Sequence, residues 1–517
     1  MQKTNPWPIV PVTAVTLALE VSMLLLTLDP TSAPPLYEQI YRGIIRLVDD
    51  GTLLPGFHLP ATRRLAATLG VNRTTVFRAY QELWARGYLE SRPGSYSTVR
   101  RPGQLPARGT VPQPAQVRWN ELAPPRNREL VGALKDLPSR PGKGDGLIDF
   151  SSLMADRDLC PADDLRRAVK HVLVSQGKDL LGYGDPQGYR PLREAIAQRL
   201  RTHGVTASAD EILVTGGSQQ ALDLVLRTFT RPGDRVAVEA PTYSMAHPLL
   251  RLHDVEVAEV PMRPDGLDLD VLTAVCAERR PVLVYTIPTF HNPTGTTTSQ
   301  THREHLLALC RQHRIPLVED GFDEELKYFG KAVLPIKSMD REGLVIYLGT
   351  FSKVVFSGLR VGWVAAPAAC VQHLLAIYRF SNLSGNTLGQ AAMARFIDEG
   401  LYEVHLRRLH RAYRGRMQAM LKGMAAHMPP GVEWTRPAGG YTLWVQIPPA
   451  AGTEAELEAR LRHHGVAVVA GNHFFCSPQP MPAFRLSIAN LKEPQIAEGC
   501  LRLGRALAEA MEGRHAA

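Results

Sequence analysis

The sequence predicts a multidomain protein, with a small, mainly α-helical module ahead of a larger α/β domain. Three observations support this prediction. A chain of 517 residues is too long for one ordinary hydrophobic core. Residues 33–100 alternate short helical patterns with turn signals, whereas residues 147–513 alternate helical stretches with short apolar runs. Between them, residues 101–146 are rich in Pro, Gly and Arg without sustained periodicity, which is typical of a linker.

The composition is that of a globular protein, with 44% hydrophobic and 21% charged residues. The net charge of +9 favours a polyanionic partner. Residues 31–100 contain nine Arg, no Lys and five acidic residues, which leaves +4 on a segment of DNA-binding size. The six cysteines form no CxxC pair, which argues against a structural zinc site and against a disulfide-rich secreted fold. We therefore expect a cytoplasmic protein without a bound metal.

Residues 1–32 form an N-terminal extension, most of which is apolar between positions 9 and 28. Pro11 and Glu20 interrupt the apolar stretch, little positive charge precedes it, and no clear cleavage motif follows. These features argue against both a membrane span and a signal peptide. We interpret the extension as a mis-started N-terminus and expect translation to begin at Met23.

A pair of short helices follows an amphipathic helix expected over residues 36–49. Thr62 is expected to cap the first helix of the pair, which stops at Gly70. Asn72 is expected to cap the second, which extends over residues 73–86. A Gly-containing turn between two short helices is typical of a helix-turn-helix.

The second helix of this pair has one apolar and one polar side. Its apolar stripe consists of Val76, Ala79, Tyr80 and Leu83. The stripe leaves Thr74, Arg78 and Gln81 on the opposite side, with Arg73 in the first turn, and such residue types contact base edges in the major groove. Residues 88–99 form two strand-like runs around a Pro-Gly turn, which predicts a β-wing with Arg92 near the DNA backbone.

Four motifs of this segment occur in a recognisable order and spacing. They are PLYEQI, the PGxxLP of Pro55–Pro60, TRRLAATLGVNRTTVFRAYQEL and GYLESRPGS. Residues 34–99 therefore resemble the GntR-type winged helix-turn-helix. The resemblance implies double-stranded operator DNA as a partner, with Arg63 and Arg73 at phosphates or base edges. The wing sequence GSYSTV departs from the family's usual GSGTFV, which affects the expected contacts of the wing tip.

Five apolar runs beyond residue 146 each end in a Gly, a Pro or a polar loop. The runs are EILVTGG, DRVAVEAP, PVLVYTIP, IPLVEDG and LVIYLGTFS. Buried strands of an α/β sheet show this pattern, with functional loops at their ends. Helical stretches are expected over residues 163–175 and 188–203.

The most specific signal is GTFSKVVFSGLRVGWVAAP, residues 349–367. Lys353 follows a hydroxyl-rich turn, and its amine is suited to form a Schiff base with the aldehyde of pyridoxal 5'-phosphate. Thr350, Ser352 and Arg360 are suited to reach the phosphate. An isolated Ser-Lys pair would favour an ordinary surface lysine instead, so the prediction depends on other loops.

Other loops supply the remaining groups that this cofactor needs. A glycine-rich turn opens a helix directly after a strand and contains Gly216, Gly217, Ser218 and Gln219. Its amides and hydroxyl suit a phosphate at a helix N-terminus. Tyr243 is suited to stack on the pyridine ring, Asn292 to donate to its phenolic oxygen, and Asp320 to pair with its protonated nitrogen. Arg485 offers a planar fork for a substrate or effector carboxylate.

Together with YGDPQGYRPLREAIA and PAGGYTLWV, these motifs resemble the fold-type I aminotransferases over residues 147–513. The resemblance implies an α/β domain with a large subdomain on a mixed, mostly parallel sheet and a small subdomain from the C-terminal part. It also implies active sites at a homodimer interface, with Tyr183 at the phosphate site of the partner subunit. Phe322 stands where relatives have a tyrosine that bonds the phenolic oxygen, which predicts weakened catalysis but retained binding.

The order of domains resembles that of the MocR family of transcription regulators, in which a GntR-type winged helix is followed by a Pro-rich linker and a fold-type I domain. The resemblance implies a domain-swapped homodimer that senses pyridoxal phosphate or an amino compound through an aldimine at Lys353 and controls nearby metabolic genes. A typical coupling of about 1–3 kcal/mol would change operator affinity roughly 5- to 150-fold. Met245 stands where members responsive to γ-aminobutyrate have an arginine, so pyridoxal phosphate or an α-amino acid held by Arg485 is the preferred effector.

Two alternatives stay open at this point. A metabolic aminotransferase whose DNA-binding module is secondary is compatible with the intact residues Lys353, Asp320, Arg360 and Arg485. The set of DNA-contacting residue types and Phe322 argue against it. An aminotransferase-shaped scaffold that binds no cofactor would leave Lys353 without a role.

Overall fold

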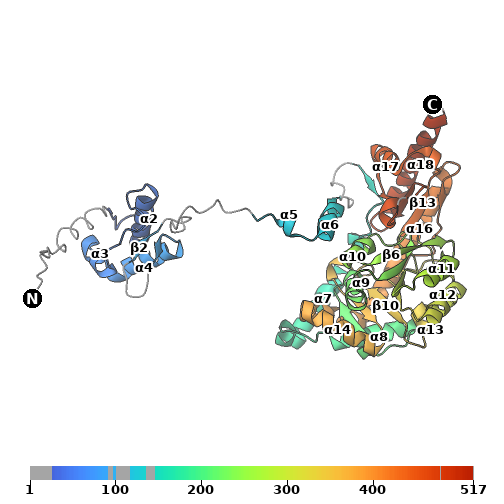
Figure 1. Ribbon diagram of the computed structural model, residues 1–517, viewed down its shortest axis with the longest axis horizontal. Coiled ribbons are helices and arrows are strands. Elements are labelled where there is room, and N and C mark those ends of the chain that lie inside the picture. The colour runs from blue at the N-terminus through green and yellow to red at the C-terminus, as the bar shows by residue number, and fades with distance from the viewer. Residues whose placement is uncertain (1–25, 91–96, 101–116, 136–145, 478, 516–517) are drawn as a thin grey trace, which may run out of the picture. The chain divides into compact units, whose positions relative to one another are not determined.

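The computed structural model describes residues 26–90, 97–100, 117–135, 146–477 and 479–515 (Figure 1). The chain divides into two compact units, Met1–Arg118 and Trp119–Ala517. Each unit has a hydrophobic core of its own. Position 23, at which translation was expected to begin, lies outside the described residues.

The first unit contains three helices and a two-stranded sheet. Its elements are α2 (Leu36–Asp49), α3 (Thr62–Leu69), α4 (Arg73–Ala85), β1 (Leu89–Glu90) and β2 (Thr98–Val99). The four apolar residues predicted for α4 are buried, and α4 packs against α2 and α3. The two strands pair in antiparallel fashion, with Leu89 opposite Val99. This is the expected winged helix-turn-helix.

The ends of the two short helices are set by local residues. Gly70 ends α3 with a φ of 63°, a left-handed conformation that glycine adopts without strain. The Asn72 side chain accepts a hydrogen bond from the Thr74 amide at 3.0 Å and so caps α4. The expectation that Thr62 caps α3 is wrong. The extended Ala61 is the N-cap and Thr62 is already helical, so no side chain caps this helix.

The segment predicted as a linker, residues 101–146, contains regular structure between residues 119 and 135. Helices α5 (Trp119–Leu122) and α6 (Pro125–Lys135) belong to the second unit. Helix α6 packs against α10 (Ala246–Leu252), and the Arg126 guanidinium forms an ion pair with Asp254 just beyond α10. The pattern was missed because α6 is short and weakly amphipathic.

The second unit is built on an eight-stranded sheet in the order β4-β11-β10-β9-β8-β5-β6-β7. The strands are β4 (Ile212–Thr215), β5 (Arg235–Ala240), β6 (Glu256–Arg263), β7 (Gly266–Leu267), β8 (Leu283–Thr286), β9 (Leu317–Asp320), β10 (Val345–Thr350) and β11 (Gly362–Ala365). Strands β10, β9, β8, β5 and β6 are parallel, whereas β11 and β7 pair in antiparallel fashion. The mixed, mostly parallel sheet is confirmed, and all five predicted apolar runs are strands of it.

Helices cover both faces of this sheet (Figure 1). They are α7 (Ala162–Gln176), α8 (Arg190–Thr202), α9 (Ser218–Phe229), α10, α11 (Leu269–Glu278), α12 (Gln300–His313), α13 (Ile336–Met339), α14 (Ala368–Asn382) and α15 (Thr387–Asp398). One core cluster joins α9 and α14 to the strands, and another joins α11 and α12 to them. This three-layer arrangement places the strand ends, and the loops that follow them, together at one edge.

The C-terminal part forms the expected smaller subdomain. It contains an antiparallel sheet of β12 (Glu433–Trp434), β13 (Thr442–Gln446), β16 (Ala483–Ser487) and β15 (Val469–Ala470), in that order, with helices α17 (Glu454–His463) and α18 (Glu493–His515). Short strands β3 (Ile148–Asp149) and β14 (Val466–Ala467) pair in parallel.

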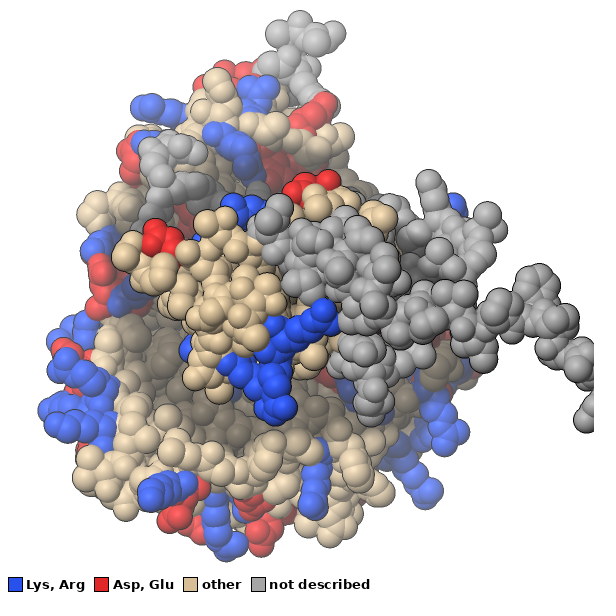
Figure 2. All heavy atoms as spheres, turned by 90° about the vertical axis from the view of Figure 1, so that its left-hand side faces the viewer, with Lys and Arg blue, Asp and Glu red and all other residues tan. Residues whose placement is uncertain are grey.

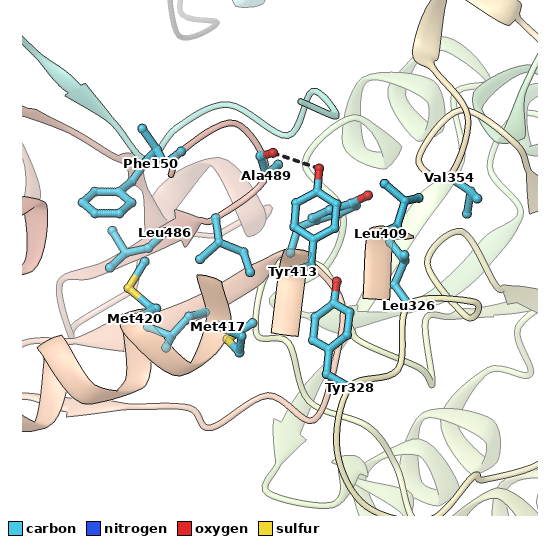
Figure 3. Packing of buried hydrophobic residues seen from close by; sticks show 14 of the residues in the cluster. Phe150, Leu326, Tyr328, Val354, Leu409, Tyr413, Met417, Met420, Leu486 and Ala489 are labelled. Atoms are coloured by element: carbon cyan, nitrogen blue, oxygen red, sulfur yellow. Dashed lines mark hydrogen bonds between the residues drawn. The ribbon is translucent and has the colours of Figure 1, made fainter. Parts of the chain in front are cut away.

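The long helix α16 (Leu401–His427) joins the two parts of the core. Figure 3 shows Tyr413 of α16 among Met417, Leu486 and Tyr328, with its hydroxyl donating to the Ala489 carbonyl at 3.0 Å.

Candidate cofactor site and DNA-binding surface

A cavity of about 260 Å³ lies where the carboxyl ends of β5, β8, β9 and β10 meet. It is lined by Leu153, Ser218, Tyr243, Ser244, Met245, Ile287, Asn292, Asp320, Phe322, Lys353 and Arg485. The fold thus brings six of the predicted site residues to one place, although they come from separate loops. A larger hollow of about 660 Å³ between α7, α8 and α15 contains none of the predicted residues, so we place the chemistry in the smaller cavity.

Lys353 follows β10 and reaches the cavity wall, where its Nζ donates to the Leu153 carbonyl at 3.1 Å. Burial lowers the pKa of Lys353, and the positive charges of Arg485 and Arg360 lower it further, against the opposing effect of Asp323 and Asp320. A lowered pKa leaves more of the amine uncharged at neutral pH, and the uncharged amine is the nucleophile.

Asp320 is the last residue of β9 and is 4% exposed. Its Oδ2 accepts a hydrogen bond from the Tyr285 hydroxyl at 2.9 Å, while its Oδ1 has no hydrogen-bond partner among the described residues. Burial raises the pKa of Asp320 to about 6. A free, buried carboxylate oxygen at the cavity wall fits a protonated ring nitrogen, which would satisfy it.

The turn before α9 has the shape of an anion cradle. Gly217 has a φ of 112°, and a Cβ atom on it would lie 2.9 Å from a guanidinium nitrogen of Arg360. Glycine therefore lets this cation approach the N-terminus of α9, which itself favours anions. The hydroxyl oxygens of Thr350, at the end of β10, and Ser352 are 3.0 Å apart.

Some of the residues that were predicted to bind the phosphate do not line the cavity itself. Within the described part of the chain, the lining includes Ser218 but not Gly217, Gln219, Thr350, Ser352 or Arg360. The Gln219 side chain donates to the Met245 carbonyl at 3.2 Å and so points along the cavity wall.

Arg485 of β16 brings a cation from the smaller subdomain to the cavity. Its Nη2 donates to the Ser151 carbonyl at 2.5 Å and its Nη1 to the Asn292 side-chain oxygen at 3.5 Å, whereas its Nε has no partner among the described residues. Burial lowers the pKa of Arg485 to about 10, so the side chain stays charged at neutral pH. This geometry suits a ligand carboxylate.

Two aromatic residues form further walls. Tyr243 is partly buried, and burial raises its pKa to about 12. Phe322 is 8% exposed and lines the cavity without a hydroxyl. Tyr183, in contrast, is 85% exposed and lies outside the cavity of its own chain.

The outward side of the helix-turn-helix is basic. Arg63 on α3 and Arg73, Thr74 and Arg78 on α4 are exposed. Figure 2 shows basic side chains gathered together on one face of the first unit. The Arg78 guanidinium lies 4.0 Å from the centre of the Tyr37 ring, a cation–π contact that holds this side chain against α2. Arg92 lies outside the described residues.

Comparisons with known proteins agree with the two domains. The family of bacterial regulatory proteins of the gntR type matches residues 36–99, and aminotransferase class I and II matches residues 151–503. The probable rhizopine catabolism regulatory protein MocR of Rhizobium meliloti is 30% identical over 412 residues, which is 78% of this chain and 80% of that protein. The chain belongs to the MocR family.

The larger unit of this MocR-family chain is also similar to enzymes. Aromatic-amino-acid aminotransferase 1 of Thermococcus litoralis is 37% identical over 358 residues, covering 68% of this chain and 86% of that protein. A crystal structure of LysN, an α-aminoadipate aminotransferase of Thermus thermophilus complexed with N-(5'-phosphopyridoxyl)-L-leucine, has a TM-score of 0.67 and 33% identity, covering 77% of this chain and 99% of that chain. The fold-type I expectation is confirmed.

Sequence reasoning missed two residues of the MocR-family site. Tyr285 holds Asp320 from the neighbouring strand. Asp323, three residues after Asp320, is a buried carboxyl whose pKa burial raises to about 8. Tyr285 could have been found, because it lies near the end of a predicted strand that neighbours the strand of Asp320. Nothing in the local sequence distinguishes Asp323 from the acidic residues beside it.

The described residues contain no group of three or more His, Cys, Asp or Glu side chains that could hold a metal ion. Their helices include none with the length and apolar character of a membrane span.

Proposed function

We propose that the chain is a transcription regulator whose operator affinity depends on pyridoxal 5'-phosphate held at Lys353. The strongest support is that one chain contains both a GntR-type winged helix and a cavity lined by Lys353, Asp320 and Arg485. In this proposal residues 1–32 are an extension, residues 33–100 bind DNA, residues 101–146 connect the parts, and residues 147–513 bind the cofactor. We also propose that the protein acts in the cytoplasm.

The cofactor is pyridoxal 5'-phosphate, which the aminotransferase class I and II family and the phosphopyridoxyl-bound neighbour both imply. When bound, this group supplies an aldehyde for an amine and an electron-withdrawing ring. Lys353 would hold its aldehyde carbon and Asp320 its ring nitrogen. Tyr243 and Asn292 would hold the ring face and its phenolic oxygen.

We assign the phosphate to the turn before α9 and the loop after β10. The residues proposed to hold it are Gly217, Ser218, Gln219, Thr350, Ser352 and Arg360, with Tyr183 from a second subunit. The close approach of Arg360 to Gly217 supports this position, because a backbone nest beside a guanidinium is a strong anion site.

The effector is proposed to be pyridoxal phosphate itself or an α-amino acid. Arg485 would hold the carboxylate, since its Nε is a buried donor without a partner among the described residues. Met245 adds an apolar wall instead of a second cation, which disfavours effectors with a distant second carboxylate.

We propose a domain-swapped homodimer as the working form. Tyr183 and several apolar side chains of the second unit are unusually exposed, among them Leu181, Val174, Phe380 and Leu383. Apolar exposure of this extent is typical of a surface that a partner covers. Sedimentation should show a dimer that Phe380→Asp dissociates. Equal masses for the wild type and this variant would contradict the proposed interface.

For the DNA-binding unit, we assign contacts to Arg63, Arg73, Thr74, Arg78 and Arg92. The exposure of the first four on the helix-turn-helix supports the assignment. Arginine and lysine contacts to phosphate release counterions, so binding should weaken steeply with salt. The ligand would act by binding one arrangement of the two units more tightly than another.

The experiment that tests the proposal is a footprint on the DNA upstream of the gene, with and without pyridoxal phosphate. We expect protection whose strength changes with the cofactor in the wild type and does not change in Lys353→Ala. No protection in either state would contradict the regulator, whereas identical protection in both states would contradict only the sensing.

A metabolic aminotransferase is the second candidate, because the cavity retains Lys353, Asp320 and Arg485 together. Steady turnover of amino donors with 2-oxoglutarate, combined with no specific operator, would favour this candidate. We expect slow or no turnover instead, since Phe322 lacks the hydroxyl that helps to tune the cofactor.

A further inference from the structure

Positive charge in the larger domain is concentrated on helix α16. Residues 147–517 contain 41 Arg and Lys residues against 39 Asp and Glu residues, which leaves a net charge of +2. Six of these cations but only one of the acidic residues, Glu403, lie on α16, so the rest of the domain is slightly acidic. Charge gathered on one element in this way indicates an anionic partner for that element, whereas evenly spread charge would serve only solubility.

Three of the cations form a line on the exposed side of the helix. Arg407, Arg411 and Arg414 stand at positions i, i+4 and i+7, which places them on one face, and all three are exposed. Tyr413 and Met417 of the same helix are buried in the core (Figure 3). At a rise of about 1.5 Å per residue, the line is about 10 Å long. We call these three residues the arginine stripe.

Neighbouring carboxylates do not neutralise the arginine stripe. None of its three residues forms an ion pair with another residue that the structure describes. The Arg414 guanidinium lies 5.5 Å from the centre of the Phe329 ring, a contact that steadies the side chain and leaves its charge uncompensated. Exposed arginines on other helices pair with a carboxylate three or four residues away, as Arg166 does with Asp163. Like charges four residues apart on a helix repel one another, and a bound polyanion would relieve this repulsion.

The chemistry around the stripe fits a phosphate backbone better than a protein surface. Stable protein interfaces have an apolar centre, but α16, which the structure describes over its whole length, exposes a single large apolar side chain, Val404. A DNA strand presents one phosphate about every 3.4 Å along the helix axis, so about three phosphates face a line of this length. The planar fork of arginine matches the geometry of a phosphate.

DNA is also the polyanion that this chain brings close to itself. The first unit belongs to a family of DNA-binding regulatory proteins and is joined to the second unit in one chain. A protein that holds an operator through one unit raises the local concentration of the adjoining duplex for its other unit. Contacts that are too weak to bind free DNA are then sufficient to hold the flanking duplex.

We propose that the arginine stripe of α16 is a second DNA-contacting surface, which binds phosphates of the duplex that flanks the operator, independently of base sequence. The proposal rests on the proposed function in taking the winged helix-turn-helix to hold the operator. It adds a contact made by the aminotransferase-like unit itself, so that the regulator engages a longer stretch of DNA than the winged helix-turn-helix alone reads.

The test compares two DNA probes with the full-length protein by fluorescence anisotropy. The core probe contains only the operator, and the long probe adds about 30 base pairs, roughly 100 Å of duplex, on each side. The wild type should bind the long probe at least about tenfold more tightly at low salt. Its slope of log affinity against log salt should be steeper by about 0.9 for each phosphate that the stripe contacts.

The triple variant Arg407→Gln, Arg411→Gln, Arg414→Gln removes the charges of the stripe and keeps a residue type that helices accept well. The advantage of the long probe and the added salt dependence should both be lost, while the affinity for the core probe stays unchanged. The corresponding triple Lys variant keeps the charges and should keep most of the advantage, because phosphate neutralisation requires a cation at each position.

The matched control is the triple variant Arg227→Gln, Arg460→Gln, Arg462→Gln. It removes the same total charge from the same unit, but each of these arginines already pairs with a carboxylate. Its long-probe advantage should equal that of the wild type.

A long-probe advantage that persists in the folded Gln variant of the stripe would overturn the proposal. An equal loss in the control variant would overturn it too, because total charge would then explain the effect. Equal wild-type affinities for the two probes would also contradict it, and would leave an acidic protein surface as the candidate partner. A wild type that fails to bind even the core probe would contradict the proposed function, and this inference with it.

Discussion

At the scale of single residues, the chemistry of Lys353 depends on the charges gathered around it. Two carboxylates and two guanidinium groups act on its amine in opposite directions, and burial strengthens all four effects. The motif around Lys353 predicted the lysine and Arg360 from sequence, because their spacing within one loop is visible. Tyr285 and Asp323 were not predicted, because their roles depend on contacts between elements.

Gly217→Ala tests the phosphate cradle. The new Cβ would meet the Arg360 guanidinium, so we expect pyridoxal phosphate to bind at least about tenfold more weakly, a loss of about 1.4 kcal/mol. Absorbance titration of the cofactor-free protein measures this. Gly233→Ala is the control, because Gly233 also has a positive φ, 83°, but nothing lies within 4 Å of its added Cβ. Equal affinities in the two variants would count against the cradle.

Asp320→Asn tests the burial of that carboxylate through pH. Its raised pKa means that the folded protein binds the proton more tightly than the unfolded chain does. The wild type without cofactor therefore loses stability as pH rises from about 4 to about 6, and the loss persists above pH 6. We expect Asp320→Asn to be more stable at pH 7, by at most about 3 kcal/mol, and equal to the wild type near pH 4. Thermal unfolding at both pH values measures the difference, and greater stability of the wild type at pH 7 would contradict the account.

At the scale of elements, periodic patterns predicted strands and helices well wherever burial sets the pattern. All five apolar runs are strands, and α2 spans the expected residues 36–49. Two predictions at this scale were wrong or incomplete. Thr62 was expected to cap α3 but does not. Helix α6 was not predicted inside the Pro-rich segment, because contact with α10 stabilises it and its own hydrophobic pattern is weak.

Arg73→Ala tests α4 as the element that contacts DNA. We expect a loss of about 1–3 kcal/mol in operator binding, and a decrease of about one in the slope of log affinity against log salt if the contact is to phosphate. Fluorescence anisotropy with labelled operator DNA measures both. Arg42→Ala on α2, where Arg42 pairs with Glu38 at 2.5 Å, is the control and should bind normally. Similar losses in both variants would indicate a general charge effect without a special role for α4.

Arg126→Ala tests whether α6 transmits the state of the cavity. Helix α6 rests on α10, and α10 begins directly after Met245 of the cavity wall. Loss of the ion pair with Asp254 should reduce the effect of pyridoxal phosphate on operator affinity while leaving cofactor affinity unchanged. Arg166→Ala, which removes an exposed ion pair on α7, should change neither quantity. Full cofactor dependence in Arg126→Ala would exclude this contact as the route.

At the scale of the whole molecule, the account joins a DNA-binding unit to a ligand-binding unit in one chain. The identity and order of the two units could be predicted from the sequence, because each unit contains several motifs of its family. How the ligand regulates DNA binding could not be predicted from the sequence. Coupling between the units depends on how much more tightly the ligand binds one arrangement than another, and no local sequence pattern records that difference.

The most direct test of the central claim is reduction of the cofactor-loaded protein with borohydride, followed by peptide mass spectrometry. The account predicts that a phosphopyridoxyl group is found on the peptide containing Lys353, and that the same protein preparation binds its operator with an affinity that the cofactor changes. A wild-type protein that stays colourless with pyridoxal phosphate and gives an unmodified Lys353 peptide would contradict it.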